Sequence, residues 1–401
     1  MKNNPNQPRE FDAVLGGKAP PPIDGLVLGG IEGVKHRLKS VDTRERATVL
    51  IDALRYGNEG LDLLVEALTD PSEQVRLFAA NLLRDKGGER GKQALLRHNP
   101  SLLFTTLDNW KFETYSPNIG INASVCTAYN VNCYDLQFYG ADLDFTLEDL
   151  QVFLKEPQVC EVEALACRIS DSYIGRDCCN ELIDLLCQSK SCLTNLKALF
   201  LGDIDDIFTH EYTSSKFFMN EINPILEAFT ELQVLKLYGL IDDNPCFKPL
   251  QHNCLKTLIV ELRNDSSILG QVCKLDLPAL EYLEVWNDGC VGGATSILTG
   301  QLFPNLYYLG LPSFENTDDI MEAITQSPTR SLAGLDLHLG ELTDKGAEIL
   351  RNSPIINYLH TLNIAKNYLS EQMTQQFSKL SCQVILQPQS NPDERYYYLY
   401  E

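Results

Sequence analysis

The sequence lacks any long apolar segment. No stretch approaches the roughly 20 uninterrupted apolar residues that a membrane-spanning helix needs. The first residues, MKNNPNQPREFDAVLGG, contain no apolar core of the length found in a secretory signal peptide. We therefore expect a cytoplasmic protein without a membrane partner.

Basic residues are scarce: 33 Lys and Arg stand against 55 Asp and Glu, for a net charge of -22. The imbalance is uneven, because residues 35–98 carry 12 basic and 10 acidic residues whereas residues 99–401 carry 18 and 41. An acidic surface repels phosphate groups, which argues against nucleic acid and anionic lipid as partners. Solubility alone also accounts for such a charge.

The 13 cysteines include no C-x-x-C pair, and their number is odd. Both features indicate reduced thiols rather than a disulfide framework. Cys167 and Cys254 stand where a leucine would fit, so we expect them in the core. No cysteine pair has zinc-ligand spacing with a nearby histidine, and we expect no metal site.

Catalytic motifs are also missing. The sequence contains no G-x-G-x-x-G, G-x-S-x-G, H-E-x-x-H or EF-hand pattern, and Gly91-Lys92 lacks the first glycine and the Ser/Thr of a P-loop. Asp336 and His338 share one face of a predicted strand, but no nucleophile occupies the equivalent positions of adjacent repeats. We expect a polar pair on a binding surface, no enzyme and no cofactor.

Helical periodicity marks residues 35–98. Apolar residues recur at i, i+3, i+4 and i+7 from Ala47, from Leu61 and from Val75, which predicts two or three short antiparallel helices. Before the third, Asp70-Pro71 followed by Glu73 is typical of a capped helix start, and Gly87-Gly88 predicts its end.

Within this region, Leu64-Val65-Glu66-Ala67-Leu68-Thr69-Asp70-Pro71-Ser72-Glu73-Gln74-Val75-Arg76 resembles a HEAT repeat of the bilin-lyase type. Together with residues 11–35 and 107–110, it is similar to an N-terminal module of cyanobacterial multi-domain proteins. The resemblance implies a small all-α HEAT-like module, and it keeps open a bilin lyase or isomerase function. Lyases of that type use arrays of several HEAT repeats, whereas only one such repeat can be recognised in this sequence.

A second pattern, L-x-x-L-x-L with Val or Ile in the last place of three copies, occurs seven times, starting at Leu196, Leu232, Leu255, Leu280, Leu306, Leu332 and Leu359. The steps between copies are 36, 23, 25, 26, 26 and 27 residues. The pattern and step resemble bacterial leucine-rich-repeat proteins with ribonuclease-inhibitor-like spacing. The resemblance implies an α/β solenoid, with a parallel sheet on the concave side and helices on the convex side, and it carries no catalytic residue.

Some details extend the repeat assignment. Thr343 or Asp344 is expected to cap a helix that buries Ala347 and Leu350. The repeat asparagine survives clearly at Asn367. Earlier repeats are expected at Val162-x-x-Leu165-x-Cys167 and, more weakly, at residues 134–138.

We therefore expect four parts: a Gly/Pro-rich leader (1–34), the HEAT-like module with its connector (35–115), the leucine-rich-repeat domain (116–388) and a capping tail (389–401). The long step after Leu196 predicts an acidic insertion at residues 203–219. Residues 396–401 alternate enough to form a short strand over the end of the solenoid.

Strand alternation then defines a candidate binding face. If the leucines point inward, the third, fifth and seventh residues of each copy face the concave side. Aromatic and acidic residues gather there in the middle repeats: Tyr238, Glu261, Tyr282, Glu284, Trp286, Tyr308, Asp336 and His338. Exposed Trp and Tyr dominate interface hot spots, although β-propensity also places aromatics on strands that a helix or the tail can cover.

The functional prediction is a non-catalytic scaffold that binds a protein partner, of basic and apolar character, on this face. Two alternatives stay open. One is the bilin lyase or isomerase-like chaperone, and the other is an effector or enzyme-inhibitor protein that uses the same concave surface.

Overall fold

The computed structural model describes residues 30–122, 127–135, 144–169, 178–203, 218–241, 245–263, 268–286, 291–326 and 332–390. The chain forms two compact units. A helical unit comprises residues 1–103, 109–111 and 124–126, and a sheet unit contains the remainder. The predicted leader lies almost wholly outside the described residues, and so does the predicted strand at 396–401.

The helical unit consists of five α-helices and two 3-10 turns within the described residues. The helices are α1 (Gly30–Arg37), α2 (Thr43–Ala53), α3 (Gly57–Ala67), α4 (Glu73–Lys86) and α5 (Gly88–His98), and the turns span Leu54–Tyr56 and Pro100–Leu103. The three periodic segments form α2, α3 and α4, which confirms the prediction of short helices there. Their apolar stripes form one core, with Leu50, Leu64 and Leu83 fully buried.

Helix α5 was missed because Gly87-Gly88 was interpreted only as a stop. Gly88 turns the chain at a φ of +57°, and a new helix starts there at once. A Cβ on Gly91 would lie 2.2 Å from the carbonyl oxygen of Leu83. The glycine therefore lets α5 cross α4 at close range.

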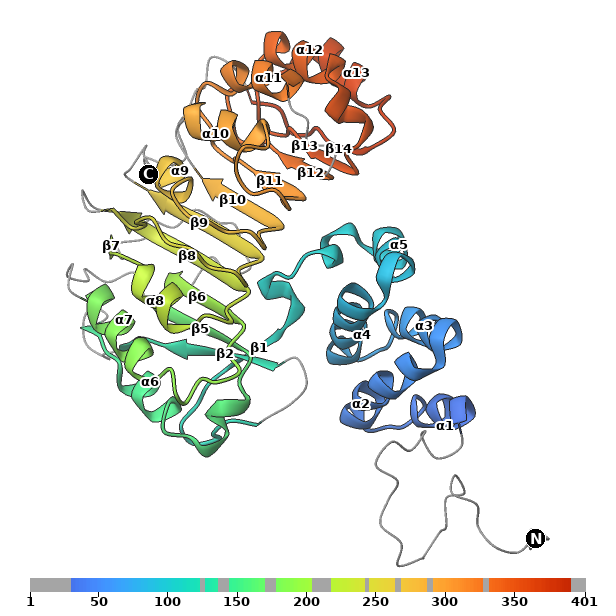
Figure 1. Ribbon diagram of the computed structural model, residues 1–401, viewed down its shortest axis with the longest axis vertical. Coiled ribbons are helices and arrows are strands. Elements are labelled where there is room, and N and C mark those ends of the chain that lie inside the picture. The colour runs from blue at the N-terminus through green and yellow to red at the C-terminus, as the bar shows by residue number, and fades with distance from the viewer. Residues whose placement is uncertain are drawn as a thin grey trace, which may run out of the picture. The chain divides into compact units, whose positions relative to one another are not determined.

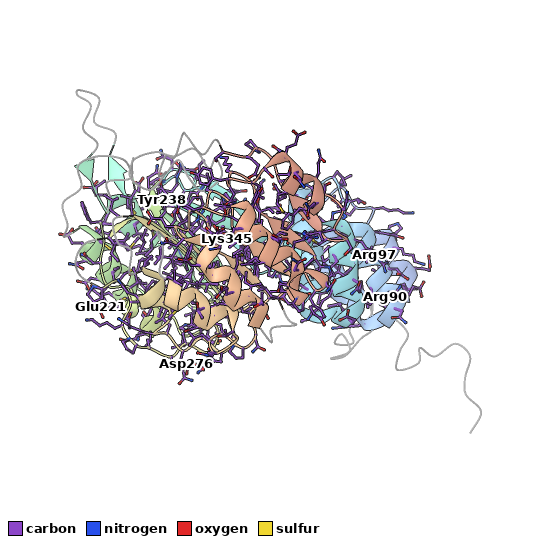
Figure 2. The ribbon with its side chains drawn as sticks, turned by 90° about the horizontal axis from the view of Figure 1, so that it is seen from above. Arg90, Arg97, Glu221, Tyr238, Asp276 and Lys345 are labelled. Atoms are coloured by element: carbon purple, nitrogen blue, oxygen red, sulfur yellow. The ribbon has the colours of Figure 1, made fainter. Side chains whose placement is uncertain are left out.

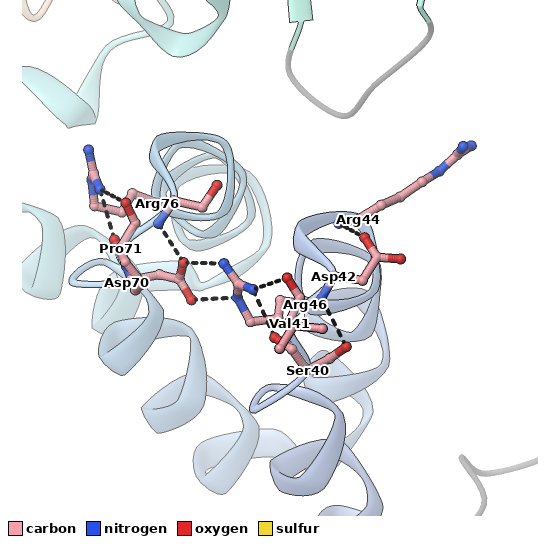
Figure 3. Close-up of polar contacts among 9 residues, drawn as sticks. Ser40, Val41, Asp42, Arg44, Arg46, Asp70, Pro71 and Arg76 are labelled. Carbon is pink, nitrogen blue, oxygen red and sulfur yellow. Dashed lines mark hydrogen bonds and ion pairs between the residues drawn. The ribbon is translucent and has the colours of Figure 1, made fainter.

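Asp70 does not cap α4, contrary to the prediction. The helix starts at Glu73 with Ser72 as its N-cap, and no side chain caps it. The Asp70 carboxylate accepts instead from Nε and Nη2 of Arg46 on α2, both at 3.0 Å, and from the backbone N–H of Ser72 at 2.8 Å (Figure 3). Asp70 therefore ties the start of α4 to α2.

A single long sheet forms the core of the other unit. In spatial order its strands are β1 (Lys111–Thr114), β2 (Thr127–Asn132), β5 (Ala164–Ile169), β6 (Ala198–Asp203), β8 (Val234–Ile241), β9 (Thr257–Arg263), β10 (Tyr282–Trp286), β11 (Tyr308–Gly310), β12 (Gly334–Asp336), β13 (Thr361–Asn363) and β14 (Gln383–Ile385), with β7 (Phe218–Met219) beside β8. From β2 to β14 neighbouring strands run parallel.

The register aligns the repeat leucines. Leu235 pairs with Leu258, Leu258 with Leu283, and Leu283 with Leu309, and all four side chains are fully buried. The helices that follow the strands lie along one side of the curved sheet: α6 (Glu148–Phe153), α7 (Cys178–Gln188), α8 (Asn223–Ala228), α9 (Ile268–Val272), α10 (Val291–Leu298), α11 (Thr317–Gln326), α12 (Asp344–Asn352) and α13 (Glu371–Phe377) (Figure 1). The unit is the predicted leucine-rich-repeat-like α/β solenoid.

The ends of the solenoid differ from the prediction. Its repeat ladder reaches back to β2, which the sequence pattern did not reveal. Tyr134 and Asp135 form β3, which pairs antiparallel with β4 (Asp144–Phe145) in a separate sheet rather than making a rung. The repeat at Val162 is confirmed as β5. At the other end β14 adds a rung that has no leucine triplet.

Most predictions for single residues are confirmed, and one is wrong. Thr343 is the N-cap of α12, where its hydroxyl accepts from Lys345 N–H, and Ala347 and Leu350 are buried as predicted. Cys167 is buried, but Cys254 is partly exposed beside Glu231. Residues 204–217 of the predicted insertion lie outside the described residues. No helix in the described part of the chain is long and apolar enough to cross a membrane.

Candidate functional site

Strand β10 presents three polar or aromatic side chains on the face opposite its leucine. Tyr282, Glu284 and Trp286 alternate with the buried Leu283 and Val285, as the two-residue period requires. The Glu284 carboxylate accepts from the Tyr282 hydroxyl at 2.8 Å and from Trp286 Nε1 at 2.9 Å. One carboxylate therefore orients both rings of the strand.

A second carboxylate repeats this arrangement two strands away. Asp336 Oδ2 accepts from the Tyr308 hydroxyl at 3.2 Å and from Asn363 Nδ2 at 3.0 Å. Its Oδ1 accepts from the His338 backbone N–H at 2.9 Å and lies 2.7 Å from His338 Nδ1. Asp336 therefore joins side chains that three neighbouring strands bring together.

Aromatic stacking connects the two carboxylate groups. The rings of Tyr282 and Tyr308 stack with centroids 4.1 Å apart and planes 3° from parallel. Space for this stack comes from Gly334, where a Cβ would lie 2.4 Å from Tyr308 Cδ2. Trp286 also meets the His338 ring edge-on at 5.4 Å. We call these six residues, Tyr282, Glu284, Trp286, Tyr308, Asp336 and His338, the aromatic–acid platform.

A residue from the connector covers part of the platform. Phe104, which belongs to the sheet unit, places its ring 5.2 Å from Tyr282 and 5.6 Å from Tyr308, edge-on to both. The phenylalanine itself is buried. The alternative that another segment covers the strand aromatics therefore holds for these two tyrosines, although the segment is neither a helix nor the tail.

The predicted site residues fall into two groups. Six of the eight form the platform, and five of these, all but Trp286, remain partly exposed. Tyr238 is fully buried, and Glu261 and Trp286 are 6% and 5% exposed. Tyr238 covers Gly202, where a Cβ would lie 2.7 Å from the tyrosine Cβ. Tyr238 therefore has no surface to offer a partner, and partner binding by the others stays a prediction.

Sequence reasoning missed two members of this region. Asn363 is the fifth residue of its repeat, as Asp336 is of the repeat before it, so the repeat pattern alone would have placed Asn363 beside Asp336 on the concave face. Phe104 follows a 3-10 turn in a segment without a repeat, and no local pattern places it on β10 and β11. Within the described residues no group of three or more His, Cys, Asp or Glu side chains is arranged to hold a metal ion.

The platform tyrosines have perturbed acidity. Burial raises the pKa of Tyr282 and of Tyr308 well above the usual value of 10.0, and the nearby Glu284 and Asp336 carboxylates add to the shift. A pKa raised by folding stabilises the protein fully below the unfolded value and less as pH rises above it. We therefore expect the platform to lose stability above about pH 10.

Tyr308→Phe tests this pH dependence. Without the phenol, the hydrogen bond to Asp336 is lost, which should cost about 2 kcal/mol at pH 8. Because the variant cannot form a phenolate at this position, its stability should fall less steeply than that of the wild type between pH 9 and 11. Thermal unfolding at each pH measures both. Identical slopes for the two proteins would contradict the raised pKa.

Comparisons with known proteins show a similarity of fold and nothing about function. No protein-family model matches the sequence, and no curated protein matches it either. A structural-genomics crystal structure of a Bacteroides fragilis protein is similar over 62% of this chain and 72% of its own, with 24% identity and a TM-score of 0.54. An internalin from Listeria monocytogenes aligns over 69% of this chain and 73% of its own, at 12% identity and a TM-score of 0.31.

Proposed function

We propose that this chain is a non-catalytic scaffold that binds a protein partner on the concave face of its sheet, at the aromatic–acid platform. Leucine-rich-repeat-like solenoids characteristically use such extended concave surfaces for binding. The observation that carries the proposal is the composition of the platform: aromatic rings held in fixed orientations by hydrogen bonds to two carboxylates.

The electrostatics of the platform favour a basic partner. The Tyr282 phenol and the Trp286 indole donate hydrogen bonds to Glu284 but do not neutralise its negative charge. No lysine or arginine in the described part of the chain pairs with Glu284 or Asp336. The negative charge therefore remains available to attract and orient a cationic segment, while the parts of Tyr282 and Tyr308 that stay exposed supply apolar contact area.

The experiment removes charge and preserves shape. Glu284→Gln with Asp336→Asn leaves side chains of the same size on the concave face, and Glu322→Gln with Glu348→Gln removes the same charge from exposed positions on α11 and α12. Quantitative affinity capture from native lysate should show a partner whose recovery falls about tenfold with the first pair and stays unchanged with the second.

Circular dichroism checks that both double variants are folded. The proposal fails if the folded platform variant and the convex-helix control retain every captured protein equally.

A further inference from the structure

A groove between α3 and α5 lies on the helical unit and contains none of the platform residues. It has a volume of about 470 Å³ and is lined by Asp62 and Val65 of α3 and by Arg90, Gln93, Ala94 and Arg97 of α5. The α5 residues are spaced i, i+3, i+4 and i+7 and therefore form one stripe of that helix. Its remaining walls come from Leu68, at the end of α3, and from His98 of α5.

The groove is basic in an acidic protein. Its lining contains Arg90 and Arg97 against a single acidic residue, Asp62, whereas the chain as a whole has a net charge of -22. The Arg97 side chain is exposed and makes no hydrogen bond or ion pair with any described residue. Arg90 pairs with Asp62 across the groove. Figure 2 labels both arginines on the helices of this unit.

The ion pair between Arg90 and Asp62 is no barrier to a ligand. Their side chains are 48% and 58% exposed, and exposed pairs contribute at most about 1 kcal/mol. A carboxylate from a partner could therefore replace Asp62 at little cost. Between the charges lies an apolar strip, where Val65 is 36% exposed and Ala94 partly exposed.

We propose that this groove binds an acidic amphipathic helix of a protein partner. Helix α5 has 11 residues, or about 16 Å of length, so the groove suits two to three turns of a helical ligand. Carboxylates on the partner helix pair with Arg90 and Arg97, and its apolar side chains rest on Val65 and Ala94. The proposal concerns a second surface and does not depend on the function of the concave face.

The test uses a synthetic peptide and the full-length chain. The probe is a fluorescein-labelled helical peptide of Glu and Ala with Leu at i, i+3, i+4 and i+7, and a Lys-for-Glu version of it serves as the charge control. Fluorescence polarisation should show saturable binding of the acidic peptide only. Arg97→Glu should weaken it about tenfold, and Arg90→Glu with Arg97→Glu should abolish it.

Arg44→Glu is the matched control. Arg44 is exposed on α2, its side chain points away from the neighbouring residues, and its reversal changes the net charge equally (Figure 3). Its affinity for the peptide should stay within about twofold of the wild type. Val65→Ser should also weaken binding, because it removes the apolar contact without changing charge. Hydrogen exchange should slow in residues 57–67 and 88–98 when the peptide binds.

Three results would overturn the proposal. The first is no binding of the acidic peptide to the wild type. The second is equal weakening by Arg44→Glu and Arg97→Glu, which would show attraction by net charge alone. The third is self-association in sedimentation that Arg97→Glu removes, which would assign the groove to a second copy of this chain. Arg97→Gln keeps the test valid if charge reversal disturbs folding.

Discussion

Replacing Asn367 by alanine is expected to lower the free energy of unfolding of the sheet unit by about 3 kcal/mol. The Asn367 side chain is fully buried and makes three hydrogen bonds to the backbone. Its Nδ2 donates to Leu337 O at 2.8 Å and to Ala365 O at 3.1 Å, and its Oδ1 accepts from Leu342 N–H at 2.9 Å.

The loss of stability arises because the backbone groups that bond the Asn367 amide lose that partner. Without it, the N–H of Leu342 and the carbonyl of Leu337 lose their partner, whereas Ala365 O keeps its bond from Leu339 N–H. Each buried group left unsatisfied costs about 1–3 kcal/mol. Asn367→Asp should destabilise at least as much at pH 7, because a carboxylate would face the carbonyls of Leu337 and Ala365. Gly340 makes room for the arrangement, since a Cβ there would lie 3.1 Å from Asn367 Oδ1.

Hydrogen exchange of residues 332–369 at increasing urea concentrations measures the effect within the sheet unit. The control is Asn305→Ala, which removes an exposed amide with one bond to Pro278 O at 2.8 Å and should cost less than about 1 kcal/mol. Equal losses for the two variants would refute a special role for the buried amide.

Replacing Asp70 by alanine is expected to destabilise the helical unit by about 3 kcal/mol. The carboxylate makes a two-pronged bond to Arg46, and the two side chains are only 12% and 11% exposed. Arg46 also donates to Ser40 O at 2.8 Å, which holds its guanidinium in place (Figure 3). Removal of Asp70 therefore leaves a buried cation without its counter-charge, and Ser72 N–H without its acceptor.

Asp62→Ala supplies the comparison for this pair. Asp62 also pairs with an arginine of the helical unit, but at an exposed position, where the contribution is at most about 1 kcal/mol. Because the chain contains two units, global unfolding does not report on one of them alone. Hydrogen exchange of α2 and α4 should accelerate strongly with Asp70→Ala and little with Asp62→Ala. Similar exchange in both variants would contradict the argument.

The last rung of the solenoid shows why some repeats escape detection. Gln389 repeats the bonds of Asn367 one rung further on: its Nε2 donates to Ile364 O at 3.0 Å, and its Oε1 accepts from Leu369 N–H at 3.2 Å. Glutamine can reach these groups as asparagine does, but it does not match the repeat pattern. Ser381 and Val384 stand where leucines are expected, since the end of a solenoid buries less surface.

The helical unit shows the limit of local rules in the same way. Apolar periodicity was enough to locate α2, α3 and α4, because burying a stripe requires that spacing whatever the neighbour. It did not reveal that Asp70 would bind Arg46 rather than cap α4. A carboxylate bonds to whichever donors the tertiary structure brings near, and Arg46 is 24 residues away in the chain.

The sequence by itself determined the parallel ladder from β5 to β13, its register and the residues at its concave positions. A repeated apolar spacing can be buried in one way only, and strand alternation then assigns the remaining residues to the opposite face. Only the tertiary structure decided which of those residues stay accessible. Tyr238 is buried over Gly202, and Phe104 covers the Tyr282–Tyr308 stack, because exposure depends on segments that no local pattern connects.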